Sequence, residues 1–329
     1  MTMKPSFIIH ILTIMSCAAA FSSCTRKISL EHTEIALGTY VKTIVITEKH
    51  NRDEAQGTIE ELYDLLFTLE GVFDYRNQDG ELNRFNTGEV LHRSDHIPLF
   101  ELVQESMEYA DLTDGYFDPT ILPLMQVWGF DTSSPRIPQL EVLESALDQV
   151  GYKQVSIDAD HIRKPEYVQL DLSGIAKGKL VDAVSDLLRD GEFNDFLVDA
   201  GGDIYVSGRN LNRRKWRVAI QDPLNRDNYI GILEKSGTAI VTSGDYENFF
   251  MGDGTRYSHL LNPFTGYPDS DIRSVTIIAH TTAFGDAIAT AVFTMGSREG
   301  YQFLLDRGIE GYIIYGEQPE SLSTPHFWD

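Results

Sequence analysis

Residues 168–182 constrain the fold more than any other stretch of the chain. An apolar run that predicts a buried strand leads to Asp171, and a Ser-Gly turn then opens a predicted helix with Lys177 in its first turns. A carboxylate, a free helix N-terminus and an ammonium group therefore meet at one end of a strand, where backbone N–H groups and the helix dipole favour a phosphate. The pattern indicates a nucleotide-like anion, although many α/β proteins have a capped strand-to-helix turn with a surface lysine.

The other predicted strands and helices follow one another irregularly. Further strands are predicted near residues 40–46, 195–199, 203–207, 215–221, 238–242, 273–279 and 311–315, and helices near residues 57–70, 98–112, 139–149, 284–295 and 298–306. Runs of strands without strict βαβ alternation favour an α+β fold over a doubly wound sheet.

The first 23 residues have the features of a secretory signal peptide. A single charge, Lys4, precedes an apolar run over residues 7–15 and then small residues. This run is too short for a membrane-spanning helix and has the flanks of a cleaved leader. Residues 1–23 are therefore predicted to be removed from the mature protein.

The segment Phe-Ser-Ser-Cys that ends at Cys24 resembles a bacterial lipobox, with Phe21 in place of the usual Leu. It predicts an acyl anchor on Cys24, a tether over residues 24–33 and one folded domain over residues 34–329. An ordinary cleaved signal with an incidental cysteine is the alternative. The predicted location is the bacterial cell envelope, with the protein anchored to a membrane and facing the periplasm.

Charge and cysteine content exclude several classes of protein. The formal net charge is −23, and nucleic-acid binding requires clustered Lys and Arg, so no nucleic-acid partner is expected. The two cysteines are Cys17 in the leader and Cys24, so the mature chain can form no internal disulfide. The chain also lacks a P-loop, a complete dinucleotide fingerprint and a His-Glu-x-x-His zinc motif.

Several short segments carry recognisable patterns in a fixed order. They are Leu-Gly-Thr at 37–39, Asp-Gly-Tyr-Phe-Asp-Pro-Thr at 114–120, Asp-Leu-Ser-Gly-Ile-Ala-Lys-Gly at 171–178, Asp-Ala-Gly-Gly-Asp at 199–203, Ser-His-Leu-Leu-Asn-Pro-Phe-Thr-Gly at 258–266 and Gly-Asp-Ala-Ile-Ala-Thr at 285–290. Together they resemble the ApbE-type flavin transferases, which move FMN from FAD onto a protein hydroxyl. The resemblance covers nearly all of the chain after the leader.

Asp286 and Thr290 are four residues apart on a predicted helix, so their oxygens lie on one face, one turn apart. A carboxylate and a hydroxyl presented together suit a hard cation such as Mg²⁺, which keeps several waters and bridges phosphates. Alternatively, Asp286 caps the helix and Thr290 packs in its core. The resemblance implies that both bind the metal, joined by the backbone carbonyl of Gly174.

A tight, proline-restricted loop holds the adjacent aromatics Tyr116 and Phe117 and the carboxylate of Asp118. Aromatics in such a loop can flank a planar ring, although they are more often hydrophobic plugs. The resemblance implies that all three residues bind FAD, and that Tyr75 lines the adenine pocket. Leu37, in the first segment, is predicted to contact FAD as well.

His259 lies in one of the patterned segments. A neutral imidazole with a pKa of about 6 to 7 can take a proton from an incoming hydroxyl, although a lone histidine is usually structural. The resemblance implies a catalytic histidine that also contacts FAD. Lys177 would offset pyrophosphate charge, and Asp171 would orient the ligand or the metal's surroundings, so both are further catalytic and FAD-binding candidates.

The resemblance implies a Mg²⁺-dependent transferase that splits the FAD pyrophosphate, attaches FMN through a phosphoester to a Thr or Ser of an acceptor protein, and releases AMP. The expected acceptor is an envelope electron-transfer subunit with a short motif containing Ser or Thr. One alternative is an FAD pyrophosphatase, in which water replaces the hydroxyl. Another is a non-catalytic flavin-binding lipoprotein.

Overall fold

The structure is a computed structural model that describes residues 26–36, 38–88, 90–225, 227–268 and 270–329. The predicted leader over residues 1–23, the predicted acylation site Cys24 and the predicted FAD contact Leu37 lie outside these residues. Among the helices that are described, none has the length and apolar character needed to span a bilayer.

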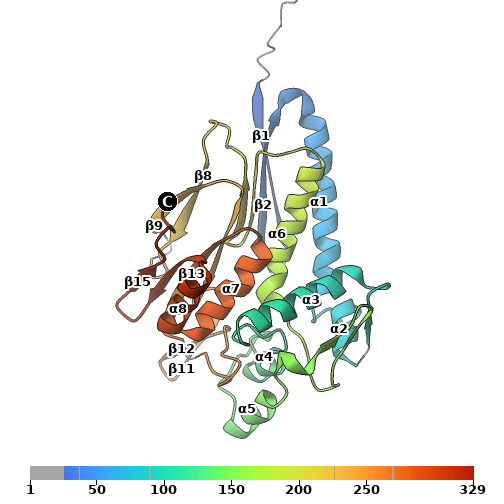
Figure 1. Ribbon diagram of the computed structural model, residues 1–329, viewed down its shortest axis with the longest axis vertical. Coiled ribbons are helices and arrows are strands. Elements are labelled where there is room, and N and C mark those ends of the chain that lie inside the picture. The colour runs from blue at the N-terminus through green and yellow to red at the C-terminus, as the bar shows by residue number, and fades with distance from the viewer. Residues whose placement is uncertain (1–25, 37, 89, 226, 269) are drawn as a thin grey trace, which may run out of the picture.

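An eight-stranded antiparallel sheet forms the centre of the molecule (Figure 1). Its strand order is β1-β2-β6-β7-β10-β13-β14-β15. The bounds are β1 (Lys27–Ala36), β2 (Thr39–Glu48), β6 (Phe196–Ala200), β7 (Asp203–Ser207), β10 (Thr238–Gly244), β13 (Ile272–Ala279), β14 (Glu310–Tyr315) and β15 (Glu320–Ser323). Antiparallel pairing with helices gathered on one face confirms the predicted α+β class.

Strand β1 overlaps the segment predicted as a tether. All ten of its residues pair with β2, from Lys27 opposite Glu48 to Ala36 opposite Thr39, so the sheet includes most of residues 24–33. Leu30 and Ala36 are buried, while the other eight residues are half-buried or exposed at the sheet edge. Polar residues are typical of an edge strand, and they hid the period-two pattern in the sequence.

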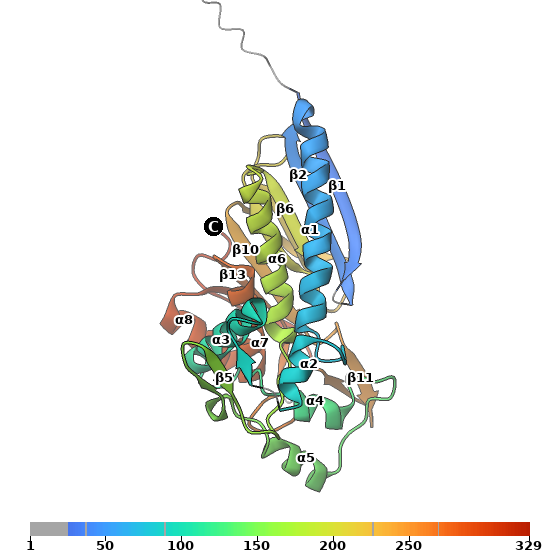
Figure 2. The same cartoon turned by 90° about the vertical axis from the view of Figure 1, so that its right-hand side faces the viewer.

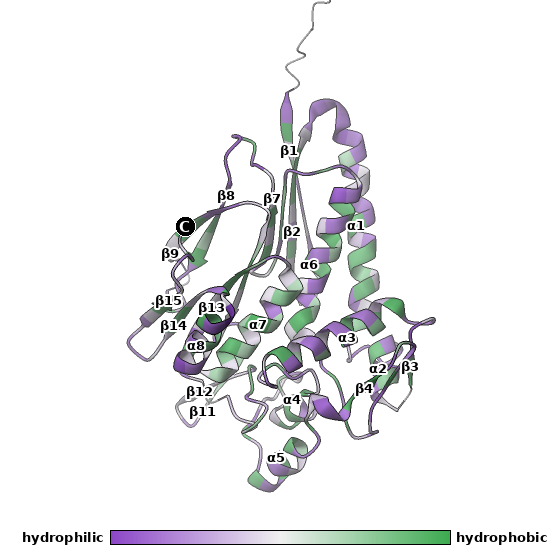
Figure 3. Cartoon of the chain, viewed as in Figure 1, coloured by the Kyte–Doolittle hydropathy of each residue, from purple (hydrophilic) through white to green (hydrophobic). Residues whose placement is uncertain are grey.

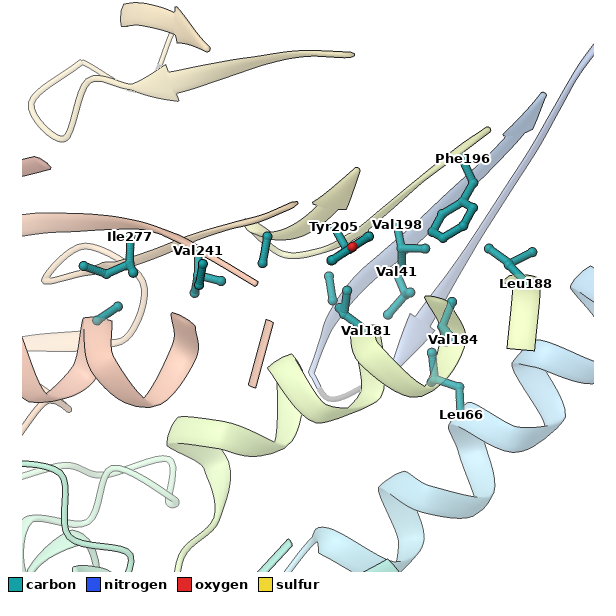
Figure 4. Packing of buried hydrophobic residues seen from close by; sticks show 14 of the residues in the cluster. Val41, Leu66, Val181, Val184, Leu188, Phe196, Val198, Tyr205, Val241 and Ile277 are labelled. Atoms are coloured by element: carbon teal, nitrogen blue, oxygen red, sulfur yellow. The ribbon is translucent and has the colours of Figure 1, made fainter. Parts of the chain in front are cut away.

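Four helices cover one face of the sheet: α1 (Arg52–Phe73), α6 (Ser173–Asp190), α7 (Thr282–Met295) and α8 (Ser297–Arg307). Figure 2 shows α1 and α6 lying along the strands. In Figure 3, hydrophobic (green) and hydrophilic (purple) residues alternate along both helices. Val181 and Val184 of α6 pack against Val198 and Tyr205 of the sheet (Figure 4). This apolar layer fixes the start of α6 relative to the sheet.

A hairpin of β8 (Trp216–Gln221) and β9 (Tyr229–Lys235) lies on the opposite face. Val218 and Ile220 of β8 belong to an apolar cluster with Val206, Ile240 and Phe327. The hairpin covers part of this face and leaves another part open (Figure 1).

The remaining elements form a lower lobe beside the end of the sheet (Figure 1). They are α2 (Glu81–Asn86), α3 (Ile97–Leu112), α4 (Leu122–Trp128), α5 (Leu140–Leu147), a 3₁₀ turn (Tyr152–Gln154), and the short strands β3 (Leu91–His92), β4 (Ser156–Ile157), β5 (His161–Arg163), β11 (Phe249–Gly252) and β12 (Thr255–Ser258). A further 3₁₀ turn (Lys49–Asn51) joins β2 to α1 at the other end of the molecule. Two further apolar clusters stabilise this lobe, and one of them also includes residues of α6 and α7.

The prediction of a strand before Asp171 is wrong, because the segment does not pair in a ladder with any strand that the structure describes. Leu170 is fully buried, but among the described residues this run makes a single isolated bridge, between Gln169 and Ile121, and no ladder. The side chain of Asn86 replaces a neighbouring strand: Leu170 N donates to Asn86 Oδ1, and Asn86 Nδ2 donates to Leu170 O, both at 2.8 Å. A buried backbone needs such partners, and an asparagine from a distant helix can supply them.

Candidate active site

A cleft of about 270 Å³ opens where the N-terminus of α6 meets α7 and the lower lobe. Every predicted site residue that the structure describes lines this cleft: Tyr75, Tyr116, Phe117, Asp118, Asp171, Gly174, Lys177, His259, Asp286 and Thr290. Segments that are far apart in the sequence are therefore brought together at one end of the sheet.

Asp286 lies where α7 crosses α6. Its side chain is only 2% exposed, and its Oδ2 accepts a hydrogen bond of 3.1 Å from Gly178 N. The helices approach so closely that a Cβ at Gly178 would lie 2.5 Å from the carbonyl oxygen of Thr282. Burial and then the nearby Asp203 carboxylate raise the pKa of Asp286 well above its ordinary value, and Lys177 opposes the rise. A cation bound beside this carboxylate would favour its ionised form.

Thr290 and Gly174 lie next to each other across the two helices. A Cβ built on Gly174 would lie 3.4 Å from Thr290 Oγ1 and 3.3 Å from the Phe117 ring. The hydroxyl and this backbone therefore border the same part of the cleft as Asp286. In the described part of the chain, no three His, Cys, Asp or Glu side chains are grouped to hold a metal. A cation here would depend on one carboxylate, a hydroxyl, a carbonyl, water and ligand oxygens, which is a donor set suited to Mg²⁺.

Lys177 reaches across from α6 to the sheet. Its Nζ is 2.9 Å from Oδ2 of Asp203, which is fully buried, while the lysine side chain keeps 24% exposure. Burial alone would lower the pKa of Lys177, but the carboxylates of Asp203, Asp286 and Glu247 outweigh it and raise the pKa. The ammonium group therefore stays charged in the cleft.

Asp203 was not predicted as a site residue. Its Oδ1 accepts no hydrogen bond from any residue that the structure describes, although it is fully buried. Asp203 does lie in the patterned segment 199–203, which is the signal that could have found it. Pairing between Asp203 and Lys177 depends on how α6 crosses the sheet, and the sequence does not specify this.

Asp118 holds the aromatic loop in shape. Its Oδ1 accepts hydrogen bonds from the backbone N (2.8 Å) and hydroxyl (2.6 Å) of Thr120, and its Oδ2 accepts one from Tyr152 N (3.0 Å). Burial raises the pKa of Asp118, while these bonds oppose the rise. Phe117 is buried, and the Tyr116 ring contacts Phe264 edge-on, with ring centroids 5.0 Å apart. The loop thus presents aromatic side chains on a rigid support.

Asp171 caps the start of α6 and is 5% exposed. Its Oδ1 accepts a 2.8 Å hydrogen bond from Ser173 N, and burial raises its pKa. Burial and then Asp171 itself raise the pKa of Tyr75, whose phenol therefore stays protonated. Arg76, which sequence reasoning missed, also lines the cleft and places its guanidinium 5.9 Å from the Tyr75 ring centroid. It supplies a second cation beside the predicted aromatic.

His259 is held by the loop before β11. Its Nδ1 lies 3.1 Å from the carbonyl oxygen of Asn248, which also accepts the backbone N–H of His259 at 3.0 Å. A carbonyl can only accept, so Nδ1 carries the hydrogen and Nε2 keeps a free lone pair. Burial lowers the pKa of His259 to about 4; the Asn248 bond opposes this and Lys177 adds to it. In this environment the imidazole is expected to be neutral at pH 7.

The fold and the cleft define a protein with a binding site between the N-terminus of α6, the face of α7 that carries Asp286 and Thr290, and an aromatic loop. The sequence profile described as the ApbE family matches residues 37–313. The chain belongs to the ApbE family.

Named relatives and solved structures agree with this assignment. The FAD:protein FMN transferase of Vibrio cholerae is 33% identical over 267 residues, which are 78% of this chain and 76% of the relative. That of Treponema pallidum is 28% identical, with 96% of this chain and 94% of the relative covered. The crystal structure of the ApbE protein from Thermotoga maritima has a TM-score of 0.84 at 31% identity, over 91% of this chain and 98% of that one.

Proposed function

We propose that this protein is a Mg²⁺-dependent FAD:protein FMN transferase. The observation that carries the proposal is the convergence, in one cleft, of a cation paired to the sheet (Lys177), a carboxylate and hydroxyl one helical turn apart (Asp286 and Thr290) and an imidazole with a free Nε2 (His259). Curated relatives with similar sequences bear the name of this activity.

The reaction follows from these groups. A hydroxyl oxygen of the acceptor attacks the phosphorus on the FMN side of the FAD pyrophosphate, and its proton passes to Nε2 of His259. The bond between that phosphorus and the bridging oxygen breaks, so AMP leaves and FMN becomes esterified to the acceptor. Phosphoryl transfer of this kind depends mainly on positioning and on neutralising charge.

Lys177 and the N-terminus of α6 would hold the pyrophosphate, because both offer positive charge to the same space. Asp286, Thr290 and the Gly174 carbonyl would hold Mg²⁺, which supplies further neutralisation of the pyrophosphate when bound. Tyr116 and Phe117 would contact the flavin ring and Tyr75 the adenine. Asp118 and Asp171 would act through the loop and the helix start that they fix.

We further propose that the mature chain is a lipoprotein anchored through Cys24 and facing the periplasm. The support is the leader sequence and the lipobox-like segment. An acceptor in the same compartment, such as an electron-transfer subunit of the envelope, would then meet the enzyme at the membrane.

Intact-mass analysis tests the activity. The full chain, purified in mild detergent, is incubated with FAD, Mg²⁺ and a library of ten-residue peptides with threonine fixed at position six. Peptides that gain the mass of FMN, with release of AMP, support transfer. Free FMN and AMP with unlabelled peptides would instead identify a pyrophosphatase, and unchanged FAD that stays bound would identify a carrier.

A further inference from the structure

A second cavity, of about 1160 Å³, lies on the face of the main sheet that the helices leave free. Its floor is formed by alternate residues of neighbouring strands, which therefore point to the same side. These residues are Lys42 and Ile44 of β2, Leu197 and Asp199 of β6, Ile204 of β7, and Ile240 and Thr242 of β10. We call this cavity the strand groove.

One wall of the strand groove is the edge of strand β8. The consecutive residues 217–221 of β8 all line it. Successive side chains of a strand point to opposite faces, so a run of five lining residues means that the backbone edge itself faces the groove. In the part of the chain that the structure describes, β8 pairs only with β9, on its other side (Figure 1). In the described part of the chain, the outer N–H and C=O groups of residues 217–220 are therefore available to another strand.

The strand groove runs into the active-site cleft. Five residues line both cavities: Arg76, Lys177, Glu247, Asn248 and His259. β8 starts at the far end of the sheet, where Trp216 Nε1 donates a 2.7 Å hydrogen bond to Ser207 O at the end of β7. Its other end, at Gln221, borders the same groove as Gly202 and His259. A strand laid along β8 would therefore lead towards the imidazole.

We propose that the strand groove binds the acceptor polypeptide as an added β-strand along β8, with the acceptor hydroxyl delivered to Nε2 of His259. The inference rests on the proposed transferase function and names where its protein substrate lies. Five residues of β8 extend roughly 17 Å at about 3.4 Å per residue, which fits a short extended segment. In such strand addition the main chain supplies affinity, and side-chain pockets supply specificity.

The floor indicates which side chains the acceptor segment presents. Ile44, Leu197 and Ile204 are only partly buried, and they pack at the border of the apolar cluster beneath the hairpin. An acceptor strand would cover them with every second side chain, because those side chains point to one face. The segment before the modified Ser or Thr should therefore alternate between apolar residues and residues of any kind.

The peptide library with threonine at position six tests this inference on the full chain. Wild-type enzyme should label peptides with apolar residues at alternate positions before the threonine. L197K, which places an ammonium on the floor, should raise KM for the peptide that wild type labels best by at least tenfold and shift the preference at one position to Asp or Glu. L305K is the matched control, because Leu305 is 39% exposed on α8, on the other face of the sheet.

Amide hydrogen exchange provides a second measurement that needs no variant. The best peptide, with valine in place of its threonine so that it cannot react, should slow exchange at residues 217–221. Equal KM and equal preference for wild type, L197K and L305K, or unchanged exchange in β8, would overturn the proposal that the strand groove binds the acceptor. Labelling of peptides by wild type would still support the transferase function. A wild type that labels no peptide and converts FAD to free FMN would remove both proposals.

Discussion

Lys177 and Asp203 form an ion pair of 2.9 Å that joins the first turns of α6 to the first residue of β7. Asp203 is fully buried and Lys177 is partly open to the cleft. The carboxylate therefore holds the ammonium at the cleft wall, where a pyrophosphate would meet it. Because Asp203 makes no other hydrogen bond through Oδ1 to the described residues, its charge depends on this one partner.

Lys177→Met should destabilise the fold by about 3–5 kcal/mol, because it leaves a buried charge without its partner. Adding Asp203→Asn should recover most of that loss, since the uncompensated charge is then removed. Lys179→Met is the control: Lys179 lies two residues along α6 and pairs with Glu105 at 2.7 Å in a more open setting, so its loss should cost under about 1 kcal/mol. Urea unfolding measures all four proteins, and equal effects at the two lysines would contradict the buried-pair interpretation.

Gly178→Ala should destabilise the protein by about 1–3 kcal/mol, because a Cβ there would lie 2.5 Å from the Thr282 carbonyl and force α6 away from α7. The hydrogen bond from Gly178 N to Asp286 would lengthen as well. Gly57→Ala is a matched control in α1, where nothing lies within 4 Å of the added Cβ; it should be neutral or stabilise by up to about 1 kcal/mol. Thermal melting of the Gly178→Ala and Gly57→Ala variants measures this difference. Equal melting temperatures would contradict a tight crossing of α6 and α7.

Asp286→Asn should lower FAD turnover by at least about 10²-fold, the loss expected when one charged contact to the developing phosphate charge is removed. The amide oxygen can still accept the hydrogen bond from Gly178, so the melting temperature should stay close to that of wild type. Mg²⁺ should no longer strengthen FAD binding in a fluorescence titration. If the variant kept both wild-type turnover and its Mg²⁺ dependence, the metal would bind elsewhere.

Local patterns predicted most of the sheet and the helices of the fold, since a helical period survives in the sequence of α1 and an alternating one in that of β8. They missed arrangements that depend on distant partners. Asn86 satisfies the backbone before Asp171 from another helix, so an apolar run resembled a strand that does not form. The edge strand β1 carries too many polar residues for a period-two hydrophobic pattern to be recognised in its sequence.

The site divides in the same way. Chemistry-bearing residues were recognised by motif, and the fold brings them to one cleft. Their environments were not predictable, because burial depends on helix crossings. Asp286 was predicted to share a helix face with Thr290, but its almost complete burial was not predicted. His259 was expected to titrate at 6 to 7, and its surroundings lower the pKa to about 4.

Cys24→Ala should leave the protein without a lipid anchor, because the thiol is the predicted acylation site. Labelled fatty acid should be incorporated into the wild type and not into the variant, and the variant should move from the membrane to the soluble fraction of a cell extract. Cys17→Ala, inside the predicted leader, is the control and should be acylated normally. Equal labelling of the Cys24 variant and the wild type would rule out anchoring at this position.

His259→Gln should transfer FMN more slowly by about 10²–10⁴-fold, the usual effect of losing a general base. FAD affinity should change little, because Lys177 and the start of α6 are the proposed phosphate contacts. The glutamine keeps a polar side chain near the Asn248 carbonyl without a basic nitrogen. A collapse of FAD affinity with an unchanged rate at saturation would make His259 a binding residue.

The pH dependence sharpens this prediction. A base is active when unprotonated, so a pKa lowered to about 4 should keep the wild-type rate level from pH 8 to about 5.5 and reduce it as the pH approaches 4. The same shift affects folding: the unfolded histidine takes up a proton near its ordinary value of about 6.5, so stability present above that pH is lost as the pH falls towards 4. In His259→Gln both dependences should be weaker. A wild-type rate that halves near pH 6.5 would show that the imidazole is more solvated in the working enzyme than in this structure.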